Sequence, residues 1–247
     1  MRQIYSGDGG SNPPAPPMRI GFFGTSETAW YGYPYQCLDT KKIAYSWNDL
    51  VCKYFNAEQF NKAVQQGSTE RVLYELKKCK KKLDLAIVNF SSYKFTYLPT
   101  CAIDFKVDDT ILNRAEQIFD YKGTQPGLKF SNHRNLCNQF KDKQEFIELC
   151  SLYKKYLYNS EAQINRQAGT LLQIDMWLKT KGIKTMYLCR PKNIPPWVSL
   201  NAGKVYDSMN ITAEEHRKYN NLPNNISIEG QRLIAKWLIK RIKDDAP

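Results

Sequence analysis

The sequence has few histidines, no closely paired cysteines and no long hydrophobic runs. Each of these features argues against a class of site or of protein. Only His133 and His216 carry an imidazole among 247 residues. The cysteines are dispersed without a C-x-x-C pair, so we expect no zinc site, and we predict no metal or other cofactor. No run approaches the ~20 apolar residues that a membrane span needs, and the N-terminus lacks an apolar signal core, which predicts no membrane insertion and no signal peptide.

The cysteine pattern also indicates the compartment in which the chain folds. There are seven cysteines, an odd number, scattered along the sequence. Such a set is typical of reduced thiols and not of a disulfide framework. We therefore expect synthesis in a reducing cytoplasm, which applies equally to a viral protein made inside its host. Cys189 lies in an apolar run and is interpreted as a small core residue.

Charge of one sign dominates the sequence. Lysine and arginine number 36 against 24 acidic residues, which gives a formal net charge of +12. This balance is compatible with a nucleic acid, an anionic polysaccharide or lipid surface, or an acidic protein. The densest basic run, at 77–82, is interpreted as the last turn of a helix predicted over 68–82, where lysines complement the helix dipole. Nucleic acid is not indicated beyond the charge itself.

The N-terminal segment has a composition that cannot form a packed core. Residues 1–17 are rich in glycine and proline, which predicts an extended or flexible arm. Two interpretations stay open for this arm: an ordinary disordered end, or an anchor that lies along a neighbouring subunit and becomes ordered on assembly. We expect a single domain over 18–247, with an inserted, lid-like region at about 94–160.

Short apolar runs alternate with helical patterns along this domain. Strands are predicted at 19–23, 60–64, 85–90 and 184–189, and helices from Ser46, over 68–82, over 160–179 and from 228 or 229 to 243. The run 85–90 is nearly continuously apolar, as expected of a strand that is covered on both faces. Alternation of this kind predicts an α/β fold, a three-layer α/β/α sandwich with a mostly parallel central sheet, similar to flavodoxin.

Four segments in a fixed order carry the chemistry of the sequence. The first predicted strand ends in Gly24-Thr25-Ser26, a turn that would present a hydroxyl at the carboxyl edge of the sheet, where open α/β sheets bind ligands. It is followed by Gln66-Gly67-Ser68-Thr69, by the segment 83–89, and by Asn225-Ile226-Ser227-Ile228-Glu229-Gly230 before the last helix. Together these segments resemble the SGNH (GDSL) hydrolases.

The resemblance implies roles for some residues and marks departures at others. It places Ser26 at the nucleophile and Gly67 at the oxyanion-binding glycine. In the third block Tyr93 falls where the family has its asparagine. In the last block, Asp-x-x-His-x-x-x-x-Gly in the family, Leu222 takes the place of the aspartate and Asn225 that of the histidine. The expected catalytic site is therefore degenerate.

The loss of the histidine can be judged from chemistry alone. A serine hydroxyl is a weak nucleophile unless a nearby base removes its proton, and an asparagine cannot accept that proton. Any serine chemistry must therefore recruit His216, with Glu214 or Glu215 to orient it, or His133. Each histidine also has a plain interpretation as a polar surface residue, and the sequence favours that interpretation.

Further side chains are candidates for ligand binding at the same edge. Trp30, Tyr31 and Tyr33 follow the serine turn, and rings in such places stack on sugars or line acyl pockets, although plain packing is an equal interpretation. The candidate binding set also contains polar residues at strand ends and in the degenerate blocks: Asn89, Tyr93, Arg190 and Asn225. Arg190 would clamp an anionic group unless it pairs with a neighbouring carboxylate.

Two classes of function follow from these residues. The favoured hypothesis is an SGNH-like domain that is non-hydrolytic or catalytically impaired. It would serve as a binding or structural module, as a component of a phage or other viral particle that recognises a glycan. The alternative is an active serine esterase, or a deacetylase of O-acetylated carbohydrate, that uses Ser26 with a relocated histidine. Expected partners are an acylated carbohydrate or glycan and neighbouring subunits contacted through the N-terminal arm.

Overall fold

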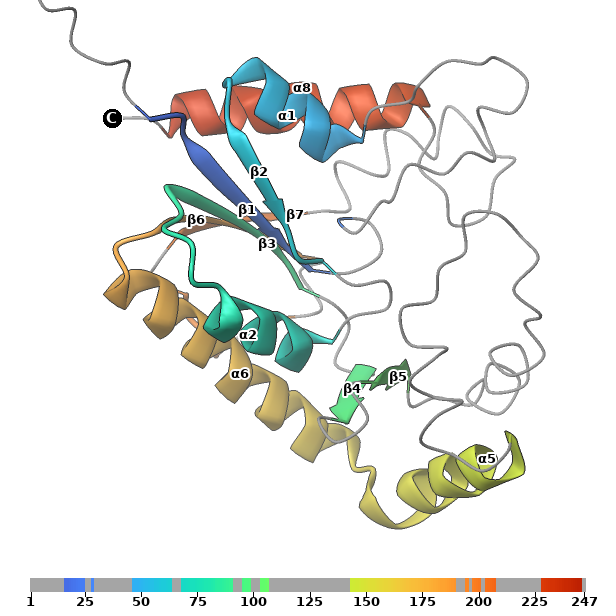
Figure 1. Ribbon diagram of the computed structural model, residues 1–247. Coiled ribbons are helices and arrows are strands. Elements are labelled where there is room, and N and C mark those ends of the chain that lie inside the picture. The colour runs from blue at the N-terminus through green and yellow to red at the C-terminus, as the bar shows by residue number, and fades with distance from the viewer. Residues whose placement is uncertain are drawn as a thin grey trace, which may run out of the picture.

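The described part of the chain is built around one parallel sheet (Figure 1). The computed structural model describes residues 16–24, 28, 46–63, 68–90, 95–98, 103–106, 143–189, 194–195, 197–200, 203–207 and 228–245. Five strands pair in the order β2-β1-β3-β6-β7, all in parallel. Their bounds are β1 Arg19–Phe23, β2 Glu58–Asn61, β3 Leu85–Asn89, β6 Lys184–Cys189 and β7 Gly203–Asp207.

Four helices cover the two faces of this sheet (Figure 1). On one face, α1 (Trp47–Tyr54) packs beside α8 (Ile228–Asp244), and on the other α2 (Thr69–Lys78) packs beside α6 (Ser160–Thr180). This arrangement is the three-layer α/β/α sandwich with a parallel sheet that the sequence predicts, and the prediction is confirmed.

The central strands are apolar because each contributes side chains to two cores. Every residue of β3 is buried, and alternate residues point to opposite faces. Ile87 joins the core beneath α1 and α8, whereas Ala86 and Val88 join the core over α2 and α6. Fully burying a side chain of the size of Ile87 or Val88 contributes about 1.5 to 3 kcal/mol, so these two cores are the main source of the stability of the fold.

Helix starts follow the sequence signals closely. Ser46 caps α1 by accepting a hydrogen bond from the Asp49 backbone N–H at 3.2 Å, and the Asp49 carboxylate accepts from the Ser46 backbone N–H at 2.9 Å. This reciprocal capping box is a strong N-terminal signal. Ser68 caps α2 without a reciprocal bond, its hydroxyl accepting a hydrogen bond from the Arg71 backbone N–H at 3.1 Å. Both predicted helix starts are confirmed.

Two predicted boundaries are wrong. The second strand was expected at 60–64, but β2 spans Glu58–Asn61 and pairs with β1 from Arg19↔Glu58 onward. It ends at Asn61 because that side chain turns back to accept a hydrogen bond from the Ala63 backbone N–H at 3.0 Å. The helix predicted over 68–82 ends at Lys78, where Cys79 becomes extended so that Leu83 can reach the core.

One strand of the sheet is missing from the sequence prediction. β7 lies at the edge of the sheet, beyond β6, and carries only a short alternation in Lys204, Val205 and Tyr206. Val205 is 46% exposed. An edge strand covered on part of its surface has no continuous apolar run, and so it lacks the signal by which the central strands were found.

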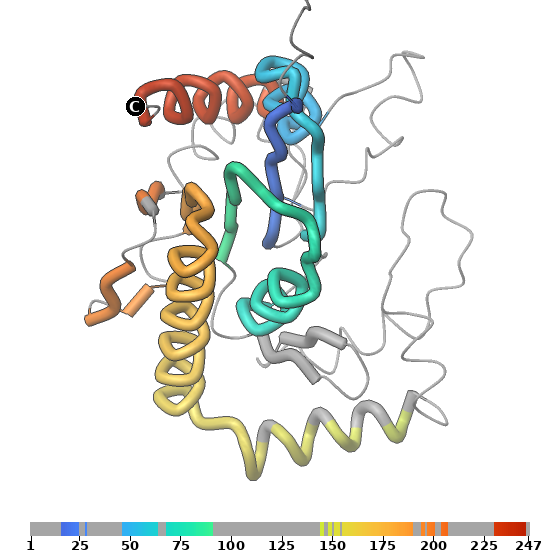
Figure 2. The backbone as a smooth tube through the Cα atoms, turned by 60° about the vertical axis from the view of Figure 1, so that its left-hand side comes forward, coloured from blue at the N-terminus to red at the C-terminus, as the bar shows by residue number. Residues whose placement is uncertain are grey.

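The region between β3 and α6 adds a small sheet and a projecting helix. Strands β4 (Phe95–Leu98) and β5 (Ile103–Lys106) pair antiparallel beside α2. Helix α5 (Lys143–Leu152) continues into a π-helical turn, η2 (Tyr153–Leu157), and extends away from the sheet (Figure 2). The apolar spacing near 143–158 in the sequence predicts helix, and α5 with η2 confirms it. Among the helices described, none is both long enough and apolar enough to cross a membrane.

Candidate functional site

The carboxyl edge of the sheet brings β1 and β3 into close contact. β1 is followed by Gly24, whose backbone has φ +150. A Cβ atom on Gly24 would lie 2.6 Å from the Asn89 carbonyl oxygen and 2.8 Å from the Asn89 Cβ. Glycine is therefore required here, because any larger residue would collide with the end of β3. The predicted serine turn, Gly24-Thr25-Ser26, starts at this contact.

Two asparagines hold the chain just beyond the predicted serine. The Thr28 carbonyl oxygen accepts a hydrogen bond from the Asn48 side-chain amide at 2.8 Å and another from the Asn61 side-chain amide at 3.1 Å. Asn48 belongs to α1 and Asn61 is the last residue of β2. Thr28 and Asn48 are fully buried. Two side-chain donors on this carbonyl, one of them from the fully buried Asn48, fix the position of Thr28.

A further buried contact connects the last helix to the same edge. The Trp47 backbone N–H, in the first turn of α1, donates to the Gln231 side-chain oxygen at 2.8 Å. Gln231 is 1% exposed and lies in the first turn of α8. Trp47 is the neighbour of Asn48 in sequence, so hydrogen bonds link Thr28, the start of α1 and the start of α8. The last block of the family pattern ends at Gly230, immediately before Gln231.

The second block begins its helix at this edge too. Ser68 follows Gly67 in sequence, is fully buried and caps α2. Since helices in such a fold run antiparallel to the strands, the N-termini of α1, α2 and α8 lie toward the carboxyl ends of β1 and β3 (Figure 1). The elements that flank the first, second and last blocks therefore meet at one edge of the sheet.

These contacts are made by neutral amides, hydroxyls and backbone groups. Near Asn48 in sequence, α1 also carries Cys52. Burial raises the pKa of the Cys52 thiol to about 12. A thiol in that state is protonated at neutral pH and is a poor nucleophile. Within the described segments, no group of three or more His, Cys, Asp or Glu side chains is placed to hold a metal ion.

Of the predicted site residues, the structure describes one. Asn89 is the last residue of β3, is 4% exposed and lies against Gly24, so it contributes to the close contact between the ends of β1 and β3. The other predicted catalytic and binding residues lie outside the described residues: Ser26, Trp30, Tyr31, Tyr33, Gly67, Tyr93, Arg190, His216 and Asn225. His133 and Leu222 also lie outside them.

Three residues that organise this edge are absent from the sequence prediction: Asn48, Asn61 and Gln231. Each is a polar residue within or beside an apolar helical or strand pattern. A polar residue on the buried side of an amphipathic element is the signal that could have identified Asn48 and Gln231, because such a residue needs a partner. The identity of the partner depends on contacts 20 to 184 positions apart in sequence, as for Asn48 with Thr28 and Trp47 with Gln231.

No family model matches the sequence, and no curated protein matches it. Several solved structures are similar in shape. A variant of the esterase AlinE4 aligns with 95% of this chain and 100% of its own, at 14% identity and a TM-score of 0.38. A carbohydrate esterase family 2 enzyme with a carbohydrate binding domain, from Corynascus thermopiles, aligns with 95% of this chain and 68% of its own, at 11% identity and a TM-score of 0.41.

A third similar structure is a lipolytic protein of the G-D-S-L family from Desulfitobacterium hafniense. It aligns with 90% of this chain and 98% of its own, at 12% identity and a TM-score of 0.33. The parallel sheet and its two helical layers give the chain an α/β/α fold of the kind that the SGNH resemblance implies.

Proposed function

We propose that the chain is an SGNH-like binding domain that has kept the frame of a serine hydrolase and lost its proton acceptor. Its ligand would be an acylated carbohydrate or a related glycan, held at the carboxyl edge of the sheet. Turnover by Ser26 would be absent or strongly impaired. This proposal differs from the alternative, an active serine esterase, in a single chemical group, the base that would activate Ser26.

The observation that carries the proposal is the hydrogen-bonded connection across this edge. Thr28 is bound by Asn48, and the neighbouring Trp47 is bound by Gln231 at the start of α8. Residues 222 and 225 shortly precede α8 in sequence, and α8 itself begins at the edge where β1 ends. These two positions have leucine and asparagine where a hydrolase needs aspartate and histidine, which supports a retained frame without a base.

Restoring the missing pair tests this proposal directly. Leu222→Asp with Asn225→His supplies an imidazole and an orienting carboxylate at the family spacing. We expect the double variant to hydrolyse p-nitrophenyl acetate roughly 100-fold or more faster than the unaltered chain, because loss of a triad member costs orders of magnitude in rate. Ser26→Ala in the same background should return the rate to the starting level.

A matched control uses the neighbouring asparagine. Leu222→Asp with Asn224→His adds the same two groups with the imidazole one position away, and it should leave hydrolysis at the background rate. A different outcome would contradict the proposal: enzyme-like turnover by the unaltered chain, lost in Ser26→Ala and in either His216→Ala or His133→Ala. That pattern would establish the active esterase with a relocated histidine.

The ligand class has its own test. An acetylated xylo-oligosaccharide should bind the unaltered chain and Ser26→Ala equally well in calorimetry, because a binding site does not need the nucleophile. Deacetylated oligosaccharide of the same length is the comparison. Equal affinity for both sugars would show that the acyl group is not recognised, and absence of binding to both would refute the glycan proposal.

A place in a viral particle is a further part of the proposal. It is supported by the glycine- and proline-rich segment 1–17 and by the abundance of lysine, asparagine and tyrosine, which suits an AT-rich genome. A chain built for such an assembly should form oligomers through that segment. Light scattering of the full chain and of a chain lacking residues 1–17 measures this, and a monomer in both cases would contradict the assembly role.

A further inference from the structure

The opposite edge of the sheet, where the strands begin, gathers exposed lysines from two connections that are distant in sequence. β3 and β6 are neighbours, with Leu85 paired to Lys184, so the segments that lead into them lie side by side. One segment follows α2 and the other follows α6, and these two helices pack together (Figure 1). We call six exposed side chains on these segments the lysine edge: Lys77, Lys78, Lys80, Lys82, Lys181 and Lys184.

The two segments that carry the lysine edge, 77–84 and 179–184, hold more than half of the net charge of the chain. Residues 77–84 carry five lysines and one aspartate, and residues 179–184 carry three lysines and no acidic residue. Their net charge is therefore seven, of the twelve that the whole chain carries. A concentration of one sign on one surface produces a directed field, whereas the same charge spread evenly would only aid solubility.

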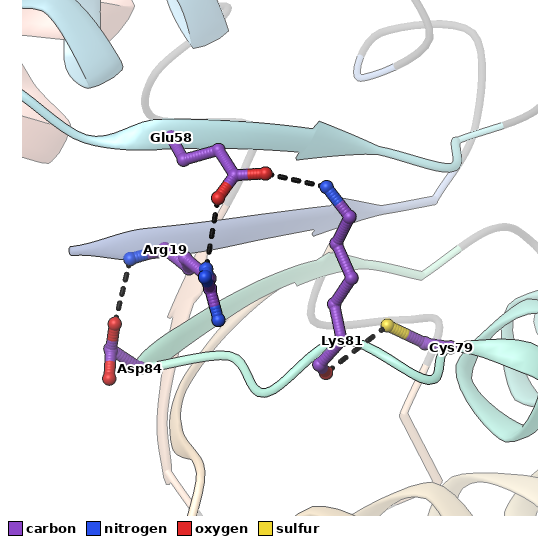
Figure 3. Close-up of polar contacts among 5 residues, drawn as sticks. All are labelled: Arg19, Glu58, Cys79, Lys81 and Asp84. Carbon is purple, nitrogen blue, oxygen red and sulfur yellow. Dashed lines mark hydrogen bonds and ion pairs between the residues drawn. The ribbon is translucent and has the colours of Figure 1, made fainter. Parts of the chain in front are cut away.

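The carboxylates that border this surface are already bound, as Figure 3 shows for Glu58 and Asp84. Glu58 accepts from Lys81 at 2.5 Å and from the Arg19 side chain at 2.9 Å, and Asp84 accepts from the Arg19 backbone N–H at 2.7 Å. Hydrogen bonds from Lys81 and then Arg19 lower the pKa of Glu58, so it stays ionised and committed to that pair. These two carboxylates are thus bonded to Arg19 and Lys81 and, in the part of the chain that the structure describes, not to the six lysines of the lysine edge.

The helix dipole explains only part of this arrangement. Lys77 and Lys78 occupy the last turn of α2, and Lys179 the last turn of α6, where a positive charge is favoured. Lys80, Lys82, Lys181 and Lys184 lie beyond the helix ends. The helix predicted to reach residue 82 would have included the first two of these, but α2 stops at Lys78 and leaves them on a connecting segment.

We propose that the lysine edge binds the phosphate backbone of double-stranded nucleic acid without reading its sequence. Lysine is a flexible point charge that suits phosphate contacts of this kind, whereas bidentate recognition uses arginine. Lysine is depleted at protein–protein interfaces, which argues against a protein partner. Among the described residues, the exposed large hydrophobic side chains all lie outside 77–84 and 179–184, so neither a membrane wedge nor a stacking platform for single strands is present on these segments.

Charge-matched variants test the proposal. Lys80→Gln, Lys82→Gln and Lys184→Gln together remove three charges from the lysine edge. Lys62→Gln, Lys155→Gln and Lys236→Gln remove three exposed charges from β2's end, η2 and α8. We expect the edge variant to bind a short random-sequence DNA duplex at least tenfold more weakly than the unaltered chain. The plot of log K against log salt concentration, measured between about 50 and 200 mM, has a negative slope. The magnitude of that slope should be smaller by about three in the edge variant.

Three results would overturn this proposal. The first is no measurable duplex binding by the unaltered chain at the low-salt end of the titration. The second is an equal loss of affinity in the edge variant and in the control variant, since that would reflect total charge alone. The third is tighter binding to vesicles of phosphatidylglycerol and phosphatidylcholine, or to heparin, than to the duplex. Circular dichroism melting of both variants verifies that they fold, and Ser26→Ala should bind the duplex unchanged.

Discussion

The two edges of the central sheet are held in opposite ways. At the carboxyl edge, the contacts are buried and neutral: Gly24 lies against Asn89, and amide side chains bind the Thr28 carbonyl and the Trp47 N–H. At the amino edge, the contacts are exposed and charged, with Glu58 between Arg19 and Lys81 and with Asp245 bound by Lys204. One polypeptide therefore uses two kinds of bond for two ends of the same layer.

This difference shows which edge needs a defined geometry. A buried polar group that loses its partner costs about 1 to 3 kcal/mol, so contacts such as Trp47 with Gln231 strongly favour one arrangement. An exposed ion pair is typically worth about 0 to 1 kcal/mol and tolerates rearrangement. The carboxyl edge therefore has the more fixed geometry, as the proposed ligand site requires, whereas the ion pairs of the amino edge can rearrange.

Glycine substitutions should separate the edges most clearly. Gly24→Ala places a methyl group 2.6 Å from the Asn89 carbonyl oxygen at φ +150, and we expect it to lower the free energy of unfolding by roughly 3 kcal/mol. Gly182, at the amino edge, has φ +65 but nothing within 4 Å of an added Cβ. Gly182→Ala should therefore cost only about 1 kcal/mol, for the backbone alone. Urea denaturation measures the free energy of unfolding of both variants. Equal losses would contradict the difference between the two edges.

The buried amide at the start of α8 should give the next largest effect. Gln231→Leu removes the acceptor of the Trp47 N–H and leaves that donor buried without a partner, which we expect to cost roughly 2 kcal/mol in unfolding free energy. Gln144→Leu is the matched control. Gln144 donates to Glu148 on the exposed surface of α5, so its loss should change stability by less than about 0.5 kcal/mol. A cost for Gln231→Leu no greater than that of the control would refute the role assigned to this contact.

Substitutions in the ion pairs of the amino edge should change stability least, and their effect should depend on pH. The pKa of Glu58 is lowered in the folded chain, chiefly by Lys81. Its contribution to stability is therefore present above the ordinary pKa of a glutamate and is lost as the pH falls through the lowered value. Glu58→Gln should lower the urea midpoint slightly at neutral pH and not at all in strong acid, with Lys81→Gln behaving alike. Added salt should shrink the difference, and a difference that persists in strong acid or high salt would contradict an exposed ion pair.

The layers of the fold could be predicted because they rest on local signals. The apolar runs at β1, β3 and β6 and the capping residues Ser46 and Ser68 are visible in sequence, and all of them fall where they were expected. The end of α2 could not be predicted in the same way. Lysines at 80–82 are compatible with a helix, and only the need to bury Leu83 beside β1 and β3 makes the chain leave it at Lys78.

The sequence by itself determined the alternation of strands and helices, and it carries the resemblance in which Leu222 and Asn225 stand where the SGNH family has aspartate and histidine. These follow from the side chains and their spacing alone. Tertiary structure decided which distant groups meet: Asn48 and Asn61 on the Thr28 carbonyl, Gln231 on Trp47, and two lysine-rich connections side by side. Such pairings depend on the order of strands in the sheet, because a buried polar group or an exposed charge acquires its partner only when the layers close.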